Sequence, residues 1–455
     1  MKYVSTRDNS KEYNFEQVFI KGLADDGGLY VPTSLKKYSP QELHELKKLN
    51  YNELSTEIIN LFSSDFISKD ELSTLVKKSY STFREKEVVK LSNVGEIKLL
   101  ELFHGPTLAF KDVAMQFIGN LYEYYLTKNN KKINIVVATS GDTGAAAIDA
   151  IKGKSNLNIF VLHPNNKISS VQRKIMTTVE EKNVFNIAIE GNFDDCQNIV
   201  KSMFSDLEFS KSINMSGVNS INWARIIAQA VYYFYSYFKL DTETISFSVP
   251  TGNFGDVFAG YLAKQMGLPI DKLIVATNEN DILHRAISKG DYVSKEVKET
   301  LSPSMDIQLA SNFERLIYYV NNSDSSKTAE IMKKVKQNSY QIEKNNLDII
   351  QKDFLSESCS EQETLDIIKK NYEENNIILD PHTAVGVGAV NKLSIHDCMV
   401  LSTAHPCKFP DATNNAINMH EKLPEELQHV LDKKENFHVL KNNTQDVKNF
   451  IKSKL

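Results

Sequence analysis

Two loops rich in glycine and hydroxyl residues each lie between an expected strand and an expected helix. The first is TSGDTG at residues 139–144, and the second is TGNFG at residues 251–255. Because glycine has no Cβ, backbone N–H groups in such loops can converge on an anion, and the following helix adds the positive end of its dipole. One loop of this kind is more often a plain tight turn. Two in one chain favour a ligand with phosphate or carboxylate groups.

Other segments carry groups suited to covalent or acid–base chemistry. Lys111 follows an apolar Leu-Ala-Phe run, and burial of its stem would favour the neutral amine that a base or a Schiff-base lysine requires. A surface lysine that opens a helix beside Asp112 is the commoner arrangement for this spacing alone. The segment STAHPCK at 402–408 follows an apolar run and holds hydroxyls, an imidazole, a thiol and an amine. Asn222 and Arg225 are spaced to share one face of a helix.

The elements that must position these groups alternate between short apolar strands and helices. Strands are expected at residues 133–138, 158–162, 185–189, 244–249, 272–276 and 398–401. This alternation predicts an α/β fold whose mostly parallel sheet is covered on both faces, with ligands at the carboxyl ends of the strands. Residues 1–90 read as mostly helical, with one helix beginning at Ser39-Pro40. Residues 321–376 are polar with a weak helical period, which indicates a helical insertion.

Composition limits the possible functions. The 455 residues carry a net charge of −5, which argues against a nucleic-acid or anionic-membrane binder and requires anions to be held by local geometry. The four cysteines form no CxxC pair, so a disulfide scaffold or zinc ribbon is excluded and a reducing compartment is expected. No metal site, signal peptide or membrane span is predicted, and we expect a cytoplasmic protein. A P-loop, GxGxxG, HExxH and GxSxG are all missing from the sequence, which disfavours a nucleotide-dependent kinase, a zincin and an α/β-hydrolase.

Taken in order, these motifs resemble those of the threonine synthase family, within the tryptophan-synthase-β-like (fold type II) group of pyridoxal-phosphate enzymes. The principal matching motifs are FKD at 110–112, SGDTG at 140–144, PTGNFGD at 250–256 and STAH at 402–405. Further matching segments are residues 22–32, 193–197, 219–225, 276–283, 302–307 and 379–386. The resemblance implies two open, mostly parallel sheets with helices on both faces, plus a mainly helical N-terminal region. The implied domains are residues 1–95, 96–215 with the lysine and the SGDTG loop, and 216–455 with the insertion at about 321–376.

The resemblance also implies roles for individual residues. Lys111 becomes the catalytic lysine that forms a Schiff base with pyridoxal phosphate. Besides Lys111, the resemblance implies that Thr403, with Ser402, contacts the ring nitrogen of the cofactor. Asn222 is a further implied cofactor contact. The implied contacts of the cofactor phosphate are Thr251, Gly252, Asn253, Phe254 and Gly255. The implied substrate contacts are Ser140, Gly141, Asp142, Thr143 and Gly144 at the carboxylate end, and Arg225 and Lys408 toward the phosphate. Since the Asp142 carboxylate would repel an anion, we expect it to orient its loop by accepting N–H bonds.

The implied reaction converts O-phospho-L-homoserine and water into L-threonine and phosphate. Lys111 would act as a neutral base, so its pKa should lie well below the ~10.4 of a free lysine. Water must be kept out until phosphate has left, which favours domain closure around a small-molecule substrate in a monomer or homodimer. Two alternatives stay open. One is a related pyridoxal-phosphate threonine or serine dehydratase or phospho-amino-acid lyase, and the other is a non-catalytic module that binds phosphate ligands.

Overall fold

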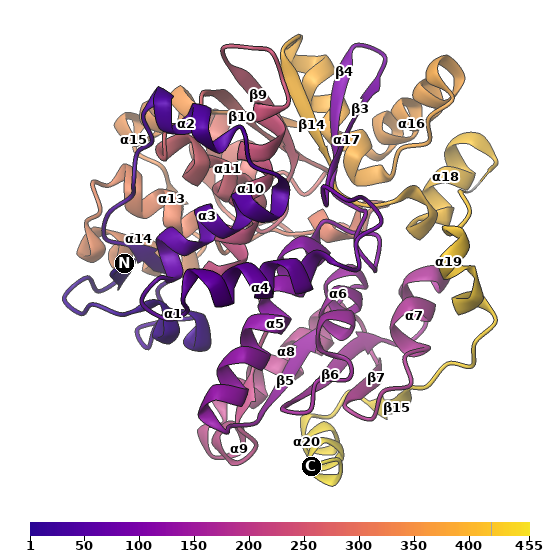
Figure 1. The fold of residues 1–455 in the computed structure, drawn as a ribbon. Helices are drawn as coiled ribbons and strands as arrows, with labels where there is room; N and C mark the ends of the chain where they lie inside the picture. Colours follow the sequence, from indigo (N-terminus) through magenta and orange to yellow (C-terminus); the bar gives the residue numbers. More distant parts are fainter. Residues whose placement is uncertain (420) are drawn as a thin grey trace.

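The computed structural model describes residues 1–419 and 421–455 and contains two main sheets (Figure 1). The larger sheet has six strands in the order β13-β10-β9-β14-β4-β3. Its strands are β3 Lys90–Val94, β4 Ile97–Glu101, β9 Ile245–Pro250, β10 Ile270–Thr277, β13 Phe354–Ser358 and β14 Cys398–Ser402. All neighbouring strands are parallel except the antiparallel hairpin β3–β4.

Helices cover both faces of this six-stranded sheet. Successive residues of a strand point to opposite sides of the sheet, so its apolar side chains pack against helices on both faces. Val400 and Ile274 pack with α17 (Pro381–Leu393) in one apolar cluster. Met399 and Leu273 pack on the other face with α10 (Trp223–Phe238) and α11 (Gly255–Gln265). Strands buried on both sides explain the near-continuous apolar runs in the sequence.

The smaller sheet has five strands, all parallel, in the order β15-β7-β6-β5-β8. Its strands are β5 Ile133–Ala138, β6 Leu157–Pro164, β7 Val184–Glu190, β8 Met215–Ser216 and β15 His438–Lys441. The helices around it are α5 Lys111–Asn129, α6 Asp142–Ile151, α7 Ser170–Thr177, α8 Phe193–Ser205, α9 Leu207–Ser212 and α20 Thr444–Ser453. Residues of α5 and α6 pack on one face, and residues of α8, α9 and α20 pack on the other.

The N-terminal region is mainly helical, as expected, and lies beside α10 and α5 (Figure 1). Its elements are β1 Tyr3–Ser5, α1 Phe15–Lys21, β2 Tyr30–Pro32, α2 Pro40–Leu46, α3 Tyr51–Ser63 and α4 Lys69–Tyr80. The predicted helix start is confirmed: Ser39 caps α2, and Glu42 closes a capping box with it. Asn50 and Ser68 begin α3 and α4 with the same device.

The remaining elements belong to the second half of the chain. They are α12 Ile282–Lys289, β11 Asp291–Tyr292, η1 Pro303–Met305, α13 Phe313–Val320, α14 Ser325–Lys336, β12 Tyr340–Gln341, α15 Lys344–Asp353, α16 Glu361–Asn375, η2 Pro406–Lys408, α18 Pro410–Ile417, α19 Glu425–Gln428 and η3 His429–Leu431. Across the described residues, we find no helix that is both long enough and apolar enough to cross a membrane.

The predicted α/β fold and all six predicted strands are confirmed. The polar segment 321–376 is helical but also contains β13, which forms an edge of the six-stranded sheet. Sheet membership also crosses the expected domain boundary at residue 215, because β4 joins the six-stranded sheet and β15 joins the five-stranded one. The yellow C-terminal segment in Figure 1 makes this second crossing as it runs from α18 to α20. The division into three domains remains a prediction.

Candidate active site

Lys111 is the first residue of α5, and the segment before it runs beside the segment that follows β14. Ala109 and Ala404 form an antiparallel bridge. The Phe110 N–H donates to the Thr403 carbonyl over 2.8 Å. Two segments almost 300 residues apart are thereby joined, which brings Lys111 close to the STAHPCK loop.

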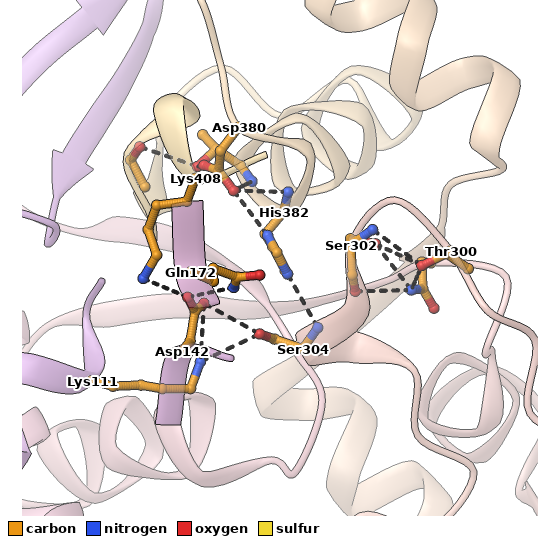
Figure 2. A network of polar contacts seen from close by, with 12 residues as sticks. Lys111, Asp142, Gln172, Thr300, Ser302, Ser304, Asp380, His382 and Lys408 are labelled. Carbon is orange, nitrogen blue, oxygen red and sulfur yellow. Dashed lines mark hydrogen bonds and ion pairs between the residues drawn. The ribbon is translucent and has the colours of Figure 1, made fainter. Parts of the chain in front are cut away.

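The Lys111 amine is buried within a polar network (Figure 2). Its Nζ lies 3.7 Å from Asp142 Oδ2 and 3.5 Å from Ser304 Oγ, and 4.6 Å from the centre of the Phe110 ring. Burial lowers the pKa of Lys111 to about 8; Asp142 opposes this shift, while Arg225 and Lys408 add to it. The expected low pKa is confirmed, and a substantial fraction of the amine is neutral near physiological pH.

Asp142 and Lys408 form a buried ion pair beside Lys111. Lys408 is 0% exposed, and its Nζ lies 2.5 Å from Asp142 Oδ1 and donates to the Thr107 carbonyl over 2.8 Å. Gln172 Nε2 donates to the same Asp142 oxygen over 2.9 Å. Burial would raise the pKa of Asp142, but Lys408 and Lys111 outweigh it and hold the pKa well below its usual range. The carboxylate is therefore ionised.

The TSGDTG loop is oriented by Thr139, not by Asp142 as we expected from the sequence. Thr139 Oγ1 accepts hydrogen bonds from the N–H groups of Gly141, over 2.9 Å, and Gly144, over 2.8 Å. The Asp142 side chain instead turns toward Lys408 because a buried carboxylate needs a cation. The hydroxyls of Ser140 and Thr143 form no hydrogen bond with any residue that the structure describes. They remain available to a ligand.

Glycine is required in this loop at residue 141. Its φ is +136°, and a Cβ there would lie 2.7 Å from the side-chain amide of Gln172. The loop can therefore pack closely against α7, which carries Gln172 into the site.

The TGNFG loop presents four backbone N–H groups that have no partner among the described residues, those of Gly252, Asn253, Phe254 and Gly255. Phe254 adopts a left-handed conformation with a φ of +63°, and its ring packs on Phe313 and Phe354. A Cβ at Gly252 would lie only 2.6 Å from the Ser304 carbonyl oxygen. The loop is thus a closely packed turn whose free N–H groups at the start of α11 suit a phosphate.

The side chains of Arg225 and Thr403 also have no hydrogen-bond partner among the residues that the structure describes. The Arg225 side chain is buried and has no ion pair or side-chain hydrogen bond with the described residues. Burial lowers its pKa to about 10. An unpaired guanidinium in such a place indicates room for an anionic ligand. The Thr403 hydroxyl is likewise unpartnered in the described chain, whereas the Ser402 hydroxyl lies 3.1 Å from that of Thr383.

Asn222 is largely occupied by structural contacts. Its Oδ1 accepts from the Ala224 N–H over 3.0 Å and caps α10, while its Nδ2 donates to the Phe19 carbonyl over 2.9 Å. The side chain therefore ties the N-terminal region to α10. One amide hydrogen remains for a ligand.

Sequence reasoning missed three side chains that lie in this site, those of Gln172, Ser304 and His382 (Figure 2). His382 Nδ1 lies 3.0 Å from Asp380 Oδ1, and its Nε2 accepts from the Ser304 N–H over 3.3 Å. These contacts place the ring proton on Nδ1 and fix η1 against the lysine. Ser304 and His382 lie in the family-like segments 302–307 and 379–386, but nothing in the local pattern of those segments specifies these contacts.

Comparison with known proteins covers almost the whole chain. Residues 2–80 match the family described as threonine synthase N terminus, residues 90–400 the pyridoxal-phosphate dependent enzyme family, and residues 383–451 the family described as threonine synthase, C-terminal. The chain is 46% identical to the threonine synthase of Saccharomyces cerevisiae, over 100% of this chain and 98% of that protein. It is 43% identical to the threonine synthase of Pseudomonas aeruginosa, over 99% and 98%.

A solved structure is similar over the same length. The crystal structure of threonine synthase with bound pyridoxal phosphate from Brucella melitensis superposes with a TM-score of 0.96 at 43% identity, and covers 100% of this chain and 99% of that one.

Proposed function

This chain belongs to the threonine synthase family, and from that premise we propose that it converts O-phospho-L-homoserine and water into L-threonine and phosphate. It is a pyridoxal-phosphate-dependent lyase. The observation that carries the proposed substrate is the buried Lys111 amine beside three groups able to bind anions: the two glycine loops and Arg225, whose side chain has no ion pair within the described chain. The proposed substrate carries a carboxylate and a phosphate, and the cofactor carries a phosphate of its own. The site must therefore bind three anionic groups, which matches the three anion-binding groups present.

The residues present fit the cofactor. We assign Lys111 to its aldehyde carbon, the free N–H groups of residues 252–255 to its phosphate, and the Thr403 hydroxyl to its ring nitrogen. Asn222 adds its remaining amide hydrogen. When bound, pyridoxal phosphate supplies an electron sink that stabilises negative charge on substrate carbons near the amine.

Lys111 performs the proton transfers. Its neutral amine takes the Cα proton of the substrate. A Cβ proton passes to the departing γ-phosphate, and the Lys111 ammonium returns its proton at Cγ. Water then adds its hydroxide at Cβ and its remaining proton at Cα, which completes the conversion. A pKa of about 8 suits both directions of transfer, because neither form of the amine is rare at neutral pH.

The substrate's charged ends are assigned to separate groups. The hydroxyls of Ser140 and Thr143, with the N-terminus of α6, suit the carboxylate. Arg225 suits the leaving phosphate because a guanidinium offers several donors in one plane. The Lys408 amine is held by the Asp142 carboxylate and the Thr107 carbonyl. We therefore propose that Lys408 adds positive charge to the site from the far side of the Asp142 carboxylate.

The test is to incubate the purified protein with O-phospho-L-homoserine, assay released phosphate and identify the amino-acid product. Threonine and phosphate in equal amounts are expected, and Lys111→Ala should abolish both. Formation of 2-oxobutyrate would instead identify a dehydratase. No turnover of any phospho-amino acid by protein carrying its cofactor would indicate a non-catalytic binding module.

We also propose a cytoplasmic monomer or homodimer built of the three domains 1–95, 96–215 and 216–455. The four cysteines are buried and free of disulfides, which suits a reducing compartment. Light scattering of the purified protein would distinguish the two oligomeric states.

A further inference from the structure

The Asp142 side chain divides its contacts between an anchored oxygen and one that faces the reacting amine (Figure 2). Oδ1 is held by Lys408 Nζ at 2.5 Å and by Gln172 Nε2 at 2.9 Å. Oδ2 lies 3.7 Å from Lys111 Nζ and 3.4 Å from Ser304 Oγ. Since Asp142, Gln172 and Lys408 come from α6, α7 and η2, three elements fix the direction of this carboxylate.

This geometry does not suit a contact with a substrate carboxylate. Asp142 is ionised and only 3% exposed, and a second carboxylate at van der Waals distance would be repelled. The loop's unpartnered hydroxyls at Ser140 and Thr143 can hold that group without Asp142. The aspartate therefore has a different task.

The charges around Lys111 indicate that task. The amine is influenced by Asp142 on α6, Arg225 on α10, Lys408 on η2 and, more weakly, Asp256 on α11. Of these, Asp142 is the carboxylate within ion-pair distance in the described structure. Without it, a lysine that has just taken up a proton would face two cations in a buried site.

We propose that Asp142 is a positioning residue for Lys111: anchored by Lys408, its carboxylate orients the amine and stabilises the ammonium formed when Lys111 takes a proton from the substrate. No proton passes to Asp142, which stays ionised throughout. The proton stays on Lys111 until it is returned to the substrate. The role of the Asp142–Lys111 pair in proton transfer rests on the proposed function. The contact between the two side chains does not depend on that function.

The test measures the titration of Lys111 directly, in the full-length chain after removal of the cofactor. Trace acetylation with acetic anhydride at a series of pH values, followed by mass spectrometry of the Lys111 peptide, gives the midpoint at which the amine becomes reactive. Asp142→Asn should lower this midpoint by about one pH unit or more, a tenfold change in the ratio of neutral to protonated amine. Lys408→Met should move it the other way, because a cation is lost and Asp142 is left with Lys111.

Asp149→Asn is the matched control, since Asp149 lies on the same helix and pairs with Lys152 away from the site. Its midpoint should equal that of the unaltered chain. The proposal is overturned if Asp142→Asn leaves the midpoint unchanged or raises it, or if Lys408→Met lowers it. If Asp142→Asn does not fold, as judged by circular dichroism, the Lys408→Met shift decides. Because no substrate is used, these outcomes are independent of the product assay for the proposed reaction.

Discussion

The buried amine of Lys111 should destabilise the cofactor-free fold, and Lys111→Met should relieve the effect. Burial lowers the pKa of this lysine from 10.5 to about 8. One pKa unit corresponds to about 1.4 kcal/mol, so protonated Lys111 lowers the free energy of unfolding by about 3 kcal/mol at pH 7. Asp142 keeps its pairing with Lys408 in the variant, so no new unpaired charge is created.

The pH dependence separates this charge effect from packing. A lysine whose folded pKa is depressed destabilises the fold fully below the folded value, and the penalty vanishes as the pH rises past the unfolded value. The stability advantage of Lys111→Met over the unaltered chain should therefore fall from about 3 kcal/mol at pH 7 to about 1 kcal/mol near pH 10. Any difference in packing between Lys and Met is the same at every pH.

Urea unfolding of both full-length chains without cofactor, repeated across this pH range, measures the advantage. Lys77→Met, at an exposed position of α4, is the control and should show no such trend. A difference between Lys111→Met and the unaltered chain that does not change with pH would refute the reasoning, because the amine would then titrate alike in the folded and unfolded chains.

Three further predictions concern the ligand-binding groups. Arg225→Gln should reduce kcat/KM for O-phospho-L-homoserine by about 10- to 100-fold, since a charge-assisted hydrogen bond is lost; an unchanged value in the phosphate-release assay would contradict its assignment. Gly252→Ala should weaken cofactor retention in equilibrium dialysis, because its Cβ would lie 2.6 Å from the Ser304 carbonyl oxygen. Full retention would show that η1 can shift to accept the added methyl group. Thr139→Val removes two hydrogen bonds to loop N–H groups and should cost about 1–3 kcal/mol in urea unfolding. Equal stability would mean that water replaces the hydroxyl.

Strands could be predicted where burial on both faces leaves a continuous apolar run. β9 and β14 are of this kind, and both were found within about one residue of their observed limits. β13, with the sequence FLSES, was missed because it pairs on one side only and just its first two residues are apolar. Such a short polar edge strand takes its conformation from its neighbour, β10, and not from its own residues.

The candidate site was predictable in its groups but not in their pairing. The order of the motifs along the chain singled out Lys111 and both glycine loops as candidates, since each motif consists of residues adjacent in sequence. The expected loop-orienting role of Asp142 was wrong because its partner Lys408 lies in another part of the chain. Ser304 and Gln172 were not predicted, because their contacts depend on how η1 and α7 pack against α6.

The position of β15 has a consequence for synthesis on the ribosome. β7 ends at Glu190, and β15, its neighbour in the sheet, begins at His438, so translation at about 5–20 residues per second delays the partner by roughly 10–50 s. During that interval the apolar β7 is an open sheet edge, which other nascent chains could extend by strand pairing. Residues 438–441 therefore replace the apolar β7 by a more polar, mostly exposed strand at this edge of the sheet, and the growing polypeptide obtains them long after β7. A chain terminated between Lys408 and His438 would carry every predicted active-site residue but would leave the apolar β7 as the open edge.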